Sequence, residues 1–305
     1  MKKTVYVLGA LILALLALIA SGIRPDIPVE KLKPKYANEQ SHFIVIDGLT
    51  VHYRDEGQGF PLVLLHASPS SLQSFDGLAA ELSRKYRVIR LDLPGYGLTG
   101  PNPTGDYSLQ WYMRFLGSFL NAVHVDFCYM AGNSFGGRLA CEYAYQKTGT
   151  VKKLVLIASS GYPLNEEGVL AMKMARNSLL RPIVRYVTPR FFVAMNLKEV
   201  YANQNIPAAT VDRYYELMLR TGNRDTFIAM SNGEPEDNSG HIKTLKLPTL
   251  ILWGGSDSII PPRYAKFFHR DIAGSRVIIY DGLGHLPQEV APQKLATDIS
   301  NFLNR

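Results

Sequence analysis

A serine in this chain has the surroundings that a nucleophile requires. Ser134 is the middle residue of the sequence Gly-Asn-Ser-Phe-Gly (132–136), which follows an apolar stretch and precedes a stretch of helical character. Glycine accepts backbone angles that other residues avoid, so we expect a sharp turn that presents the serine hydroxyl at its tip. A serine hydroxyl becomes nucleophilic only when a base removes its proton and a third group orients that base.

The base and its orienting group are expected downstream of the serine. Asp257 follows the apolar run 249–253, and His285 follows the run 277–280. The loops after parallel strands lie at one edge of a sheet, so both side chains are expected at the edge that carries Ser134. We predict that Ser134 attacks, that His285 is general base and then general acid, and that Asp257 orients the imidazole.

The elements that must position these residues indicate an α/β fold. Residues 42–56 hold two β-prone runs around Asp47 and Gly48, a pair that favours a hairpin turn. Short, continuously apolar runs then alternate with helical patterns, which is typical of a mostly parallel sheet flanked by helices. The predicted strands are 62–65, 87–91, 125–131, 154–158, 249–253 and 277–280, and helical spacing recurs at 109–120 and 292–302.

A segment without strand patterns interrupts this alternation. Residues 162–240 are helical in pattern and rich in Met, Tyr, Phe and Arg, so we predict a helical cap, or lid, inserted into a core formed by 42–161 and 241–305. Ten of its residues could line an apolar pocket, although we expect most of them to form the core of the cap itself. They are Met172, Met174, Phe191, Phe192, Met195, Tyr214, Tyr215, Met218, Phe227 and Met230. Arg181, Arg185 and Arg190 fit either a substrate carboxylate or a solvated helix face.

The N-terminal residues differ from the rest of the chain. Two lysines precede an uncharged stretch at 4–23, and 20 helical residues match the hydrocarbon thickness of a bilayer, about 30 Å. We predict an uncleaved transmembrane anchor over 1–23 and an extended linker over 24–41, with the catalytic domain outside the cytoplasm, which is the periplasm in a bacterium. The alternative is a cleaved signal peptide and a secreted protein.

Composition argues against several other classes of protein. The net charge of +7 is spread along the chain without long basic runs, which argues against nucleic-acid binding. Cys128 and Cys141 lie in a predicted strand and a predicted helix, where they suit the core better than a disulfide or metal site. A serine nucleophile with its base and orienting acid needs neither a cofactor nor a metal, so we expect none. The oligomeric state stays open.

Taken together, these motifs resemble the α/β-hydrolase superfamily over nearly all of residues 42 to 305. The resemblance rests on the sequences LLHASPS (64–70) and DLPGYGLT (92–99), the serine turn, and the acid and histidine loops. It implies an oxyanion hole made by the backbone N–H groups of Phe135 and Ser68. Ala67 stands where this family usually has glycine after the histidine.

Three other residues are expected to have supporting roles. We expect His66 to brace its own loop and Asp92 to tie down its own turn. Glu289 resembles the acidic residue that often follows the histidine in this superfamily, and we expect it to give structural support.

Serine at the turn separates this chain from the haloalkane dehalogenases and epoxide hydrolases, which use aspartate there. The resemblance therefore implies a serine hydrolase that cleaves apolar small-molecule esters through an acyl-enzyme. The sequence GNSFGG is also similar to the carbon–carbon bond hydrolases of ring-cleavage products, but those enzymes generally carry Trp where this chain has Leu286. A noncatalytic ligand-binding protein on the same fold is the third hypothesis.

Overall fold

The computed structural model describes residues 6, 22–164, 170–233 and 237–304 of the chain. The predicted transmembrane anchor, 1–23, therefore lies outside the described residues except at positions 6, 22 and 23. Among the residues that the structure describes, none of the helices combines the length and apolar character needed to cross a bilayer.

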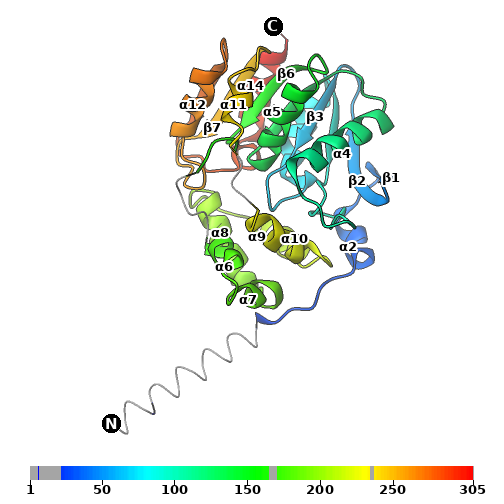
Figure 1. Ribbon diagram of the computed structural model, residues 1–305, viewed down its shortest axis with the longest axis vertical. Coiled ribbons are helices and arrows are strands. Elements are labelled where there is room, and N and C mark those ends of the chain that lie inside the picture. The colour runs from blue at the N-terminus through cyan, green and yellow to red at the C-terminus, as the bar shows by residue number, and fades with distance from the viewer. Residues whose placement is uncertain (1–5, 7–21, 165–169, 234–236, 305) are drawn as a thin grey trace.

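An eight-stranded sheet forms the centre of the molecule, with the strand order β1-β2-β4-β3-β5-β6-β7-β8 (Figure 1). The first two strands, β1 (Ser41–Ile46) and β2 (Leu49–Glu56), form the predicted antiparallel hairpin. Asp47 and Gly48 both have positive φ, as a two-residue type I′ turn requires. The remaining strands run parallel to one another: β3 (Pro61–Leu65), β4 (Arg87–Leu91), β5 (Cys128–Asn133), β6 (Val151–Ile157), β7 (Thr249–Gly254) and β8 (Arg276–Tyr280). The mostly parallel sheet is therefore as predicted.

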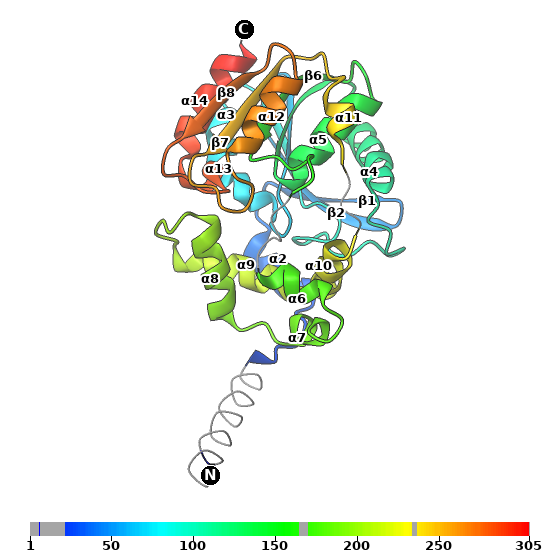
Figure 2. The ribbon, with the colours of Figure 1, turned by 60° about the vertical axis from the view of Figure 1, so that its left-hand side comes forward.

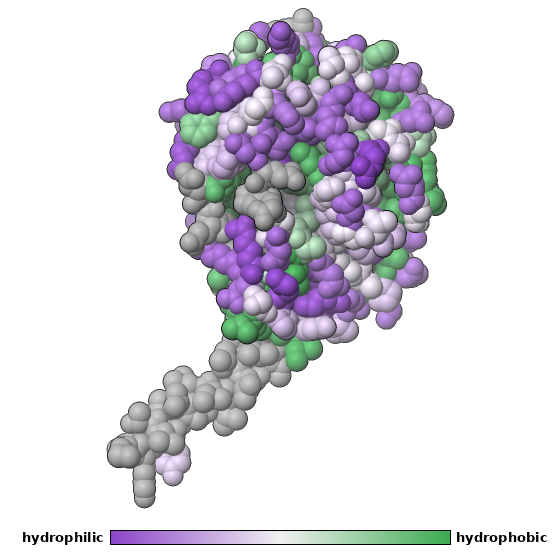
Figure 3. All heavy atoms as spheres, in the orientation of Figure 1, coloured by the Kyte–Doolittle hydropathy of each residue, from purple (hydrophilic) through white to green (hydrophobic). Residues whose placement is uncertain are grey.

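Helices cover both faces of this sheet (Figures 1 and 2). One face packs against α3 (Asp76–Leu82) and α14 (Pro292–Leu303), and the other against α4 (Leu109–Ala122), α5 (Phe135–Gln146) and α12 (Arg263–Asp271). Side chains of a strand alternate between faces. Leu62 and Leu64 accordingly belong to the apolar cluster of α3 and α14, whereas Val63 and Leu65 belong to the cluster of α4, α5 and α12. On the molecular face shown in Figure 3, hydrophilic side chains cover much of the surface, with smaller apolar areas between them.

A group of helices between β6 and β7 lies beyond one edge of the sheet, where Figures 1 and 2 both show it below the core. We call this group the cap. Its helices are α6 (Leu170–Arg176), α7 (Arg181–Tyr186), α8 (Arg190–Val200), α9 (Ala208–Met218) and α10 (Asn223–Ser231). These helices occupy the segment in which the sequence predicted a helical lid. The shorter helices η1 (Leu72–Phe75), α11 (Ser239–Ile242) and α13 (Pro287–Val290) connect elements of the core.

The prediction of an extended linker over 24–41 is wrong. Residues Val29–Tyr36 form helix α2, in which Leu32 and Tyr36 are buried against Leu98 and Leu217. Residues four apart lie on the same face of a helix, and burying a leucine side chain contributes about 1.5–3 kcal/mol. This packing maintains the helix although it contains Pro34.

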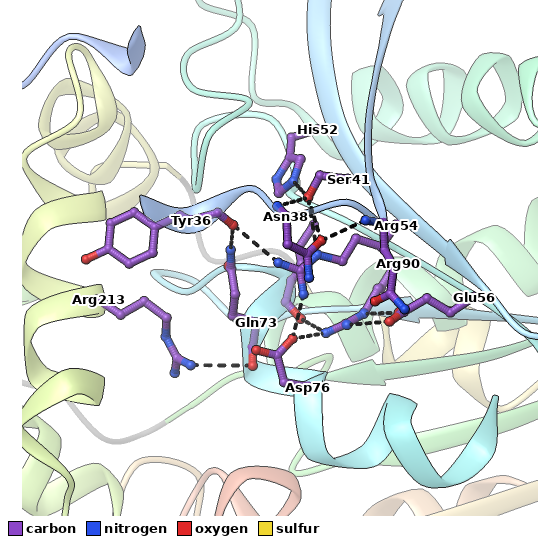
Figure 4. A network of polar contacts seen from close by, with 12 residues as sticks. Tyr36, Asn38, Ser41, His52, Arg54, Glu56, Gln73, Asp76, Arg90 and Arg213 are labelled. Atoms are coloured by element: carbon purple, nitrogen blue, oxygen red, sulfur yellow. Dashed lines mark hydrogen bonds and ion pairs between the residues drawn. The ribbon is translucent and has the colours of Figure 1, made fainter. Parts of the chain in front are cut away.

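Hydrogen bonds fix the end of α2 to the core as well. The carbonyl oxygen of Tyr36 accepts hydrogen bonds from Gln73 Nε2 at 2.9 Å and from Arg54 Nη2 at 3.3 Å (Figure 4). Arg54 also forms an ion pair with Asp76 at 3.0 Å, and Asp76 contacts the buried Arg90. The segment that follows the predicted anchor is thus held by the buried Arg54 of the sheet and by Gln73.

Candidate active site

Ser134 occupies the predicted sharp turn between a strand and a helix. β5 ends at Asn133 and α5 begins at Phe135, and Ser134 between them has φ 54° and ψ −117°. Such angles are costly for a residue with a side chain and occur where surrounding contacts enforce them. Those contacts are backbone hydrogen bonds: the Ser134 N–H donates to Ile157 O at 3.0 Å, and the Ser134 carbonyl accepts from Ser160 N at 3.1 Å.

The glycines on either side of the serine are required by close backbone packing. A Cβ atom on Gly136 would lie 2.1 Å from the carbonyl oxygen of Leu65 in β3, and one on Gly132 would lie 2.2 Å from the carbonyl oxygen of Gly136. Neither backbone atom can move without shifting β3 or α5. The glycines therefore permit the strand-to-helix contact that supports the turn.

Asp257 and His285 lie in loops after β7 and β8 and are joined directly. His285 Nδ1 lies 2.8 Å from Asp257 Oδ2, and both side chains are buried. The other carboxylate oxygen accepts hydrogen bonds from the N–H groups of Ile259 and Ile260, at 2.9 and 3.0 Å. With the aspartate ionised, Nδ1 carries the hydrogen of this pair, and Nε2 is left to accept a proton from a nucleophile.

A cavity of about 360 Å³ brings the predicted site residues together. Ser134 and His285 both line it, and so do Ser68 and Phe135. Phe135 is the first residue of α5, so its N–H group has no acceptor within the helix. A volume above about 300 Å³ is typical of a small-molecule site. The structure thus places Ser134, His285, Ser68 and Phe135 around one space.

Most of the cavity wall beyond these residues is apolar and comes from the cap. Met172, Met174, Phe192, Tyr214, Met218, Phe227 and Met230 all line it. The expectation that most of the ten cap residues form the core of the cap is therefore wrong. Phe191 and Met195 are more than half exposed, and Tyr215 does not line the cavity. The cap helices are short, so their apolar side chains pack against the core or line the cavity rather than form a separate core within the cap.

The three arginines that could have met a substrate carboxylate have other partners. Arg185 pairs with Asp26 at 3.0 Å and with Asp225 at 2.5 Å, and Arg190 pairs with Asp212 at 2.6 Å. Arg181 Nη2 donates to Asn232 Oδ1 at 2.9 Å. None of the three lines the cavity. Their contacts hold cap helices together or bind the N-terminal segment.

The residues predicted to brace their own loops do so. His66 Nδ1 donates to Ala67 O at 2.8 Å and its Nε2 accepts from Leu93 N at 2.9 Å. Burial lowers the pKa of His66, which suits the neutral form that these two hydrogen bonds require. Asp92 accepts from the N–H groups of Leu72 and Leu98, both at 2.7 Å, and it contacts the buried His52 at 2.7 Å.

Asn133 has a role at the site that the sequence analysis did not assign. Its fully buried side chain donates to Ile157 O at 3.0 Å and to His285 O at 3.2 Å, and it accepts from Gln288 Nε2 at 3.1 Å. Asn133 is the last residue of a buried strand, where a side-chain amide needs hydrogen-bond partners. An asparagine at this position of the sequence could therefore have indicated a structural contact beside the serine. The residue before the serine therefore fixes the backbone of the histidine loop.

The two cysteines take no part in the site. Cys128 and Cys141 are free thiols buried in the core cluster on the α4 and α5 side of the sheet. Burial raises the pKa of Cys128 to about 12, so this thiol stays protonated. Within the described part of the chain, no three His, Cys, Asp or Glu side chains gather as a metal site would require.

Comparison with known proteins finds relatives that are named as a 2-hydroxymuconate semialdehyde hydrolase and as a lipase. The chain is 26% identical to 2-hydroxymuconate semialdehyde hydrolase from Pseudomonas putida, over 88% of this chain and 96% of that protein. It is also 26% identical to Lipase 1 from Psychrobacter immobilis, over 82% of this chain and 79% of that protein. The crystal structure of a membrane phospholipase A, described as a bacterial virulence factor, aligns with a TM-score of 0.76 at 24% identity and covers 100% of this chain and 98% of its own.

The sheet order, the strained serine turn and the Asp–His pair agree with the resemblance found in the sequence. A family model described as the alpha/beta hydrolase fold matches residues 61–292, which is well over half of the chain. The chain therefore belongs to the α/β-hydrolase family.

Proposed function

We propose that this α/β hydrolase cleaves carboxylic esters of apolar small molecules through an acyl-enzyme on Ser134. The observation that carries the proposal is the shared cavity, which is lined both by Ser134 and by His285, whose Nδ1 is held 2.8 Å from Asp257 Oδ2. This arrangement supplies a nucleophile, a base of fixed tautomer and a binding space in one place.

The proposed reaction has two halves. In the first, Ser134 Oγ attacks the ester carbonyl carbon while its proton passes to His285 Nε2, and the charged imidazole is stabilised by Asp257. The N–H groups of Ser68 and Phe135 bind the oxyanion. The imidazolium then gives its proton to the departing alcohol. In the second half, His285 activates a water molecule, which attacks the acyl group, releases the acid and restores the serine.

The cavity wall supports an apolar substrate. Methionine, valine and phenylalanine side chains of the cap make up much of it, and apolar groups of a ligand gain about 25 cal/mol per Å² when they leave water. Flexible methionine side chains adapt to ligands of different shape. The name of one relative, a lipase, agrees with this substrate class.

A second function follows from another relative, which is named as a hydrolase of 2-hydroxymuconate semialdehyde. In that case the cleaved bond would be a carbon–carbon bond. Leu286 follows the histidine in this chain, and the three arginines that line the cavity have partners in the protein. Arg224 pairs with Asp26, Arg176 donates to Ser231 O, and Arg138 donates to Asn238 Oδ1. These contacts leave the ester function better supported.

The test uses the full chain in a mild detergent. We expect hydrolysis of p-nitrophenyl esters, which Ser134→Ala abolishes and which the control Ser160→Ala, another serine on the cavity wall, retains. Equal rates for the native protein and Ser134→Ala would refute the proposal. Poor ester turnover with rapid bleaching of a coloured dienol substrate would favour the carbon–carbon reaction. Well-folded protein that a fluorophosphonate probe does not label would favour a noncatalytic binding protein.

We also propose that residues 1–23 anchor the protein and that the catalytic domain lies outside the cytoplasm. The two lysines before an uncharged stretch of bilayer length support this orientation. Fractionation of cells should find the protein in the membrane with its initial residues intact. A soluble extracytoplasmic protein whose sequence starts near residue 22 would show cleavage instead.

A further inference from the structure

The loop that carries His285 is bonded to the cap as well as to the core. The backbone N–H of His285 donates to the carbonyl oxygen of Val200 at the end of α8, at 2.8 Å. The contact leaves no spare room, because a Cβ atom on Gly284 would lie 2.3 Å from the same Val200 oxygen. Any movement of this part of the cap therefore moves the backbone of the predicted base.

A buried carboxylate strengthens this connection four residues further on. Glu289 accepts hydrogen bonds from the hydroxyl groups of Tyr201 and Tyr214, at 2.7 and 2.6 Å, and from Arg213 Nη2 at 2.5 Å. We call these four residues the Glu289 cluster. Its three donors belong to the cap, and its acceptor belongs to the core. The side chain of Glu289 is only 8% exposed, so its charge is balanced by Arg213 rather than by water.

Two members of the Glu289 cluster also contact the segment after Ser68, whose N–H group is a predicted oxyanion donor. The Tyr214 hydroxyl lies 3.1 Å from Ser70 Oγ, two residues after Ser68. Arg213 Nη1 donates to the carbonyl oxygen of Gln73 at 3.4 Å, a contact that Figure 4 shows. One set of cap side chains therefore touches both the histidine loop and the oxyanion loop.

An apolar layer lies beside these polar contacts. The methyl group of Ala67 packs with Leu197, Tyr201, Val211 and Leu286, so cap and core residues form one buried cluster. Ala67 is the residue that stands where this family usually has glycine. Here the added methyl group contributes apolar surface to the contact between the oxyanion loop and the cap.

We infer that Glu289 is a positioning residue: through Tyr201, Arg213 and Tyr214 it holds the cap in the one placement that sets His285 and Ser68 around Ser134. The inference rests on the proposed serine hydrolase function and extends it. Displacing reacting groups by about 1 Å costs on the order of 100-fold in rate, so loosening these contacts must show in the chemical step. A residue that only stabilised the fold would instead change the melting temperature and leave the turnover of folded protein intact.

The test compares two variants of the full chain with two matched controls. Glu289→Gln keeps the shape of the side chain but removes the charge that Arg213 and the tyrosines bind. Tyr214→Phe removes only the hydroxyl that joins Ser70 to Glu289. The controls are Asp212→Asn, which breaks the exposed Arg190–Asp212 pair next to Arg213, and Tyr215→Phe, which alters the tyrosine beside Tyr214.

The readouts are kcat and KM for a p-nitrophenyl ester, the rate of Ser134 labelling by a fluorophosphonate, and the melting temperature. We expect Glu289→Gln to lower kcat and the labelling rate by about 10-fold or more while KM changes less than about two-fold. Tyr214→Phe should show a smaller loss of the same kind, and both controls should stay within about two-fold of the native protein. If Glu289→Gln does not fold, Tyr214→Phe decides by the same criteria.

Native kcat and labelling in Glu289→Gln, or equal losses in the controls, would overturn the inference. Failure of the proposed function looks different, because the native protein would then not label at Ser134 at all. A native protein that labels, beside a Glu289→Gln variant that labels equally fast, would remove the positioning role alone.

Discussion

The side-chain amide of Asn133 donates a hydrogen bond to the carbonyl oxygen of His285, 3.2 Å away, so the residue before the proposed nucleophile holds the backbone of the proposed base. The two residues are far apart in the sequence: Asn133 ends β5, and His285 lies in the loop after β8. Their contact fixes the spacing of the loops that carry the serine and the histidine. Catalysis by a preorganised site depends on such support as much as on the reacting groups.

Asn133→Asp tests this support. The new carboxylate would face the carbonyl oxygens of Ile157 and His285, both of which accept hydrogen bonds from the present amide. A buried acceptor that loses its donor costs about 1–3 kcal/mol. We expect urea unfolding to show a loss of this size and ester turnover to fall by at least about 10-fold. Asn121→Asp, on an exposed part of α4, should change the free energy of unfolding by less than about 0.5 kcal/mol.

Gly136→Ala tests the backbone contact under the serine turn. Its methyl group would lie 2.1 Å from Leu65 O, so either β3 or α5 must shift. We expect a loss of several kcal/mol in the free energy of unfolding, or failure to fold. The control is Gly240→Ala in α11, where a Cβ atom meets no other atom within 4 Å. A Gly136→Ala protein with native stability would show that the turn tolerates a side chain.

The strands were predictable because buried parallel strands are apolar without interruption. Residues 87–91 and 249–253 were assigned almost to the observed ends, whereas the strand expected at 125–131 begins only at Cys128. The loop positions of Asp257 and His285 followed from those strands. Local sequence patterns were therefore sufficient for the strands, because the burial of a strand shows in its own apolar residues.

What the sequence did not reveal depends on partners from distant segments. Helix α2 contains a proline and several charges that favour an extended chain, and its helical form depends on burial of Leu32 and Tyr36 against residues far along the sequence. The cap methionines fit a cap core and a cavity wall equally well by pattern. Glu289 also depends on distant partners, because its carboxylate accepts hydrogen bonds from Tyr201, just after α8, and from Tyr214 in α9.

Val184→Phe tests the depth of the cavity. Val184 lies in α7, the cap helix farthest from the sheet in Figures 1 and 2, and it lines the same cavity as Ser134. A larger side chain there should exclude long acyl chains but leave room for short ones. We expect kcat/KM for decanoate and dodecanoate esters to fall by about 10-fold or more and for acetate esters to change less than about two-fold. Ile183→Phe, at a neighbouring position that does not line the cavity, should leave the ratio of long to short substrates unchanged.

Asp26→Asn tests the ion pairs that bind the N-terminal segment to the cap. Asp26 pairs with Arg224 at 2.6 Å and with Arg185 at 3.0 Å, and Arg224 is almost completely buried. Removing the carboxylate leaves a buried guanidinium without its countercharge, which costs about 3–5 kcal/mol at full burial and less here because Asp26 is partly exposed. We expect a loss of about 2–3 kcal/mol at pH 7 by urea unfolding. Asp225→Asn, which breaks a more exposed contact of Arg185, should cost less than about 1 kcal/mol.

The pH dependence of this loss has a definite sign. Burial acts to raise the pKa of Asp26, but the hydrogen bonds and charges of Arg224 and Arg185 outweigh it and hold that pKa below its usual value. A carboxylate with a lowered pKa in the folded state stabilises the fold above the pKa of the unfolded chain, near 4, and loses that effect as the pH falls further. The difference between the native protein and Asp26→Asn should therefore be constant from pH 7 to about pH 5 and shrink below pH 4. A difference that grows on acidification would contradict the assignment of this carboxylate as the partner of Arg224.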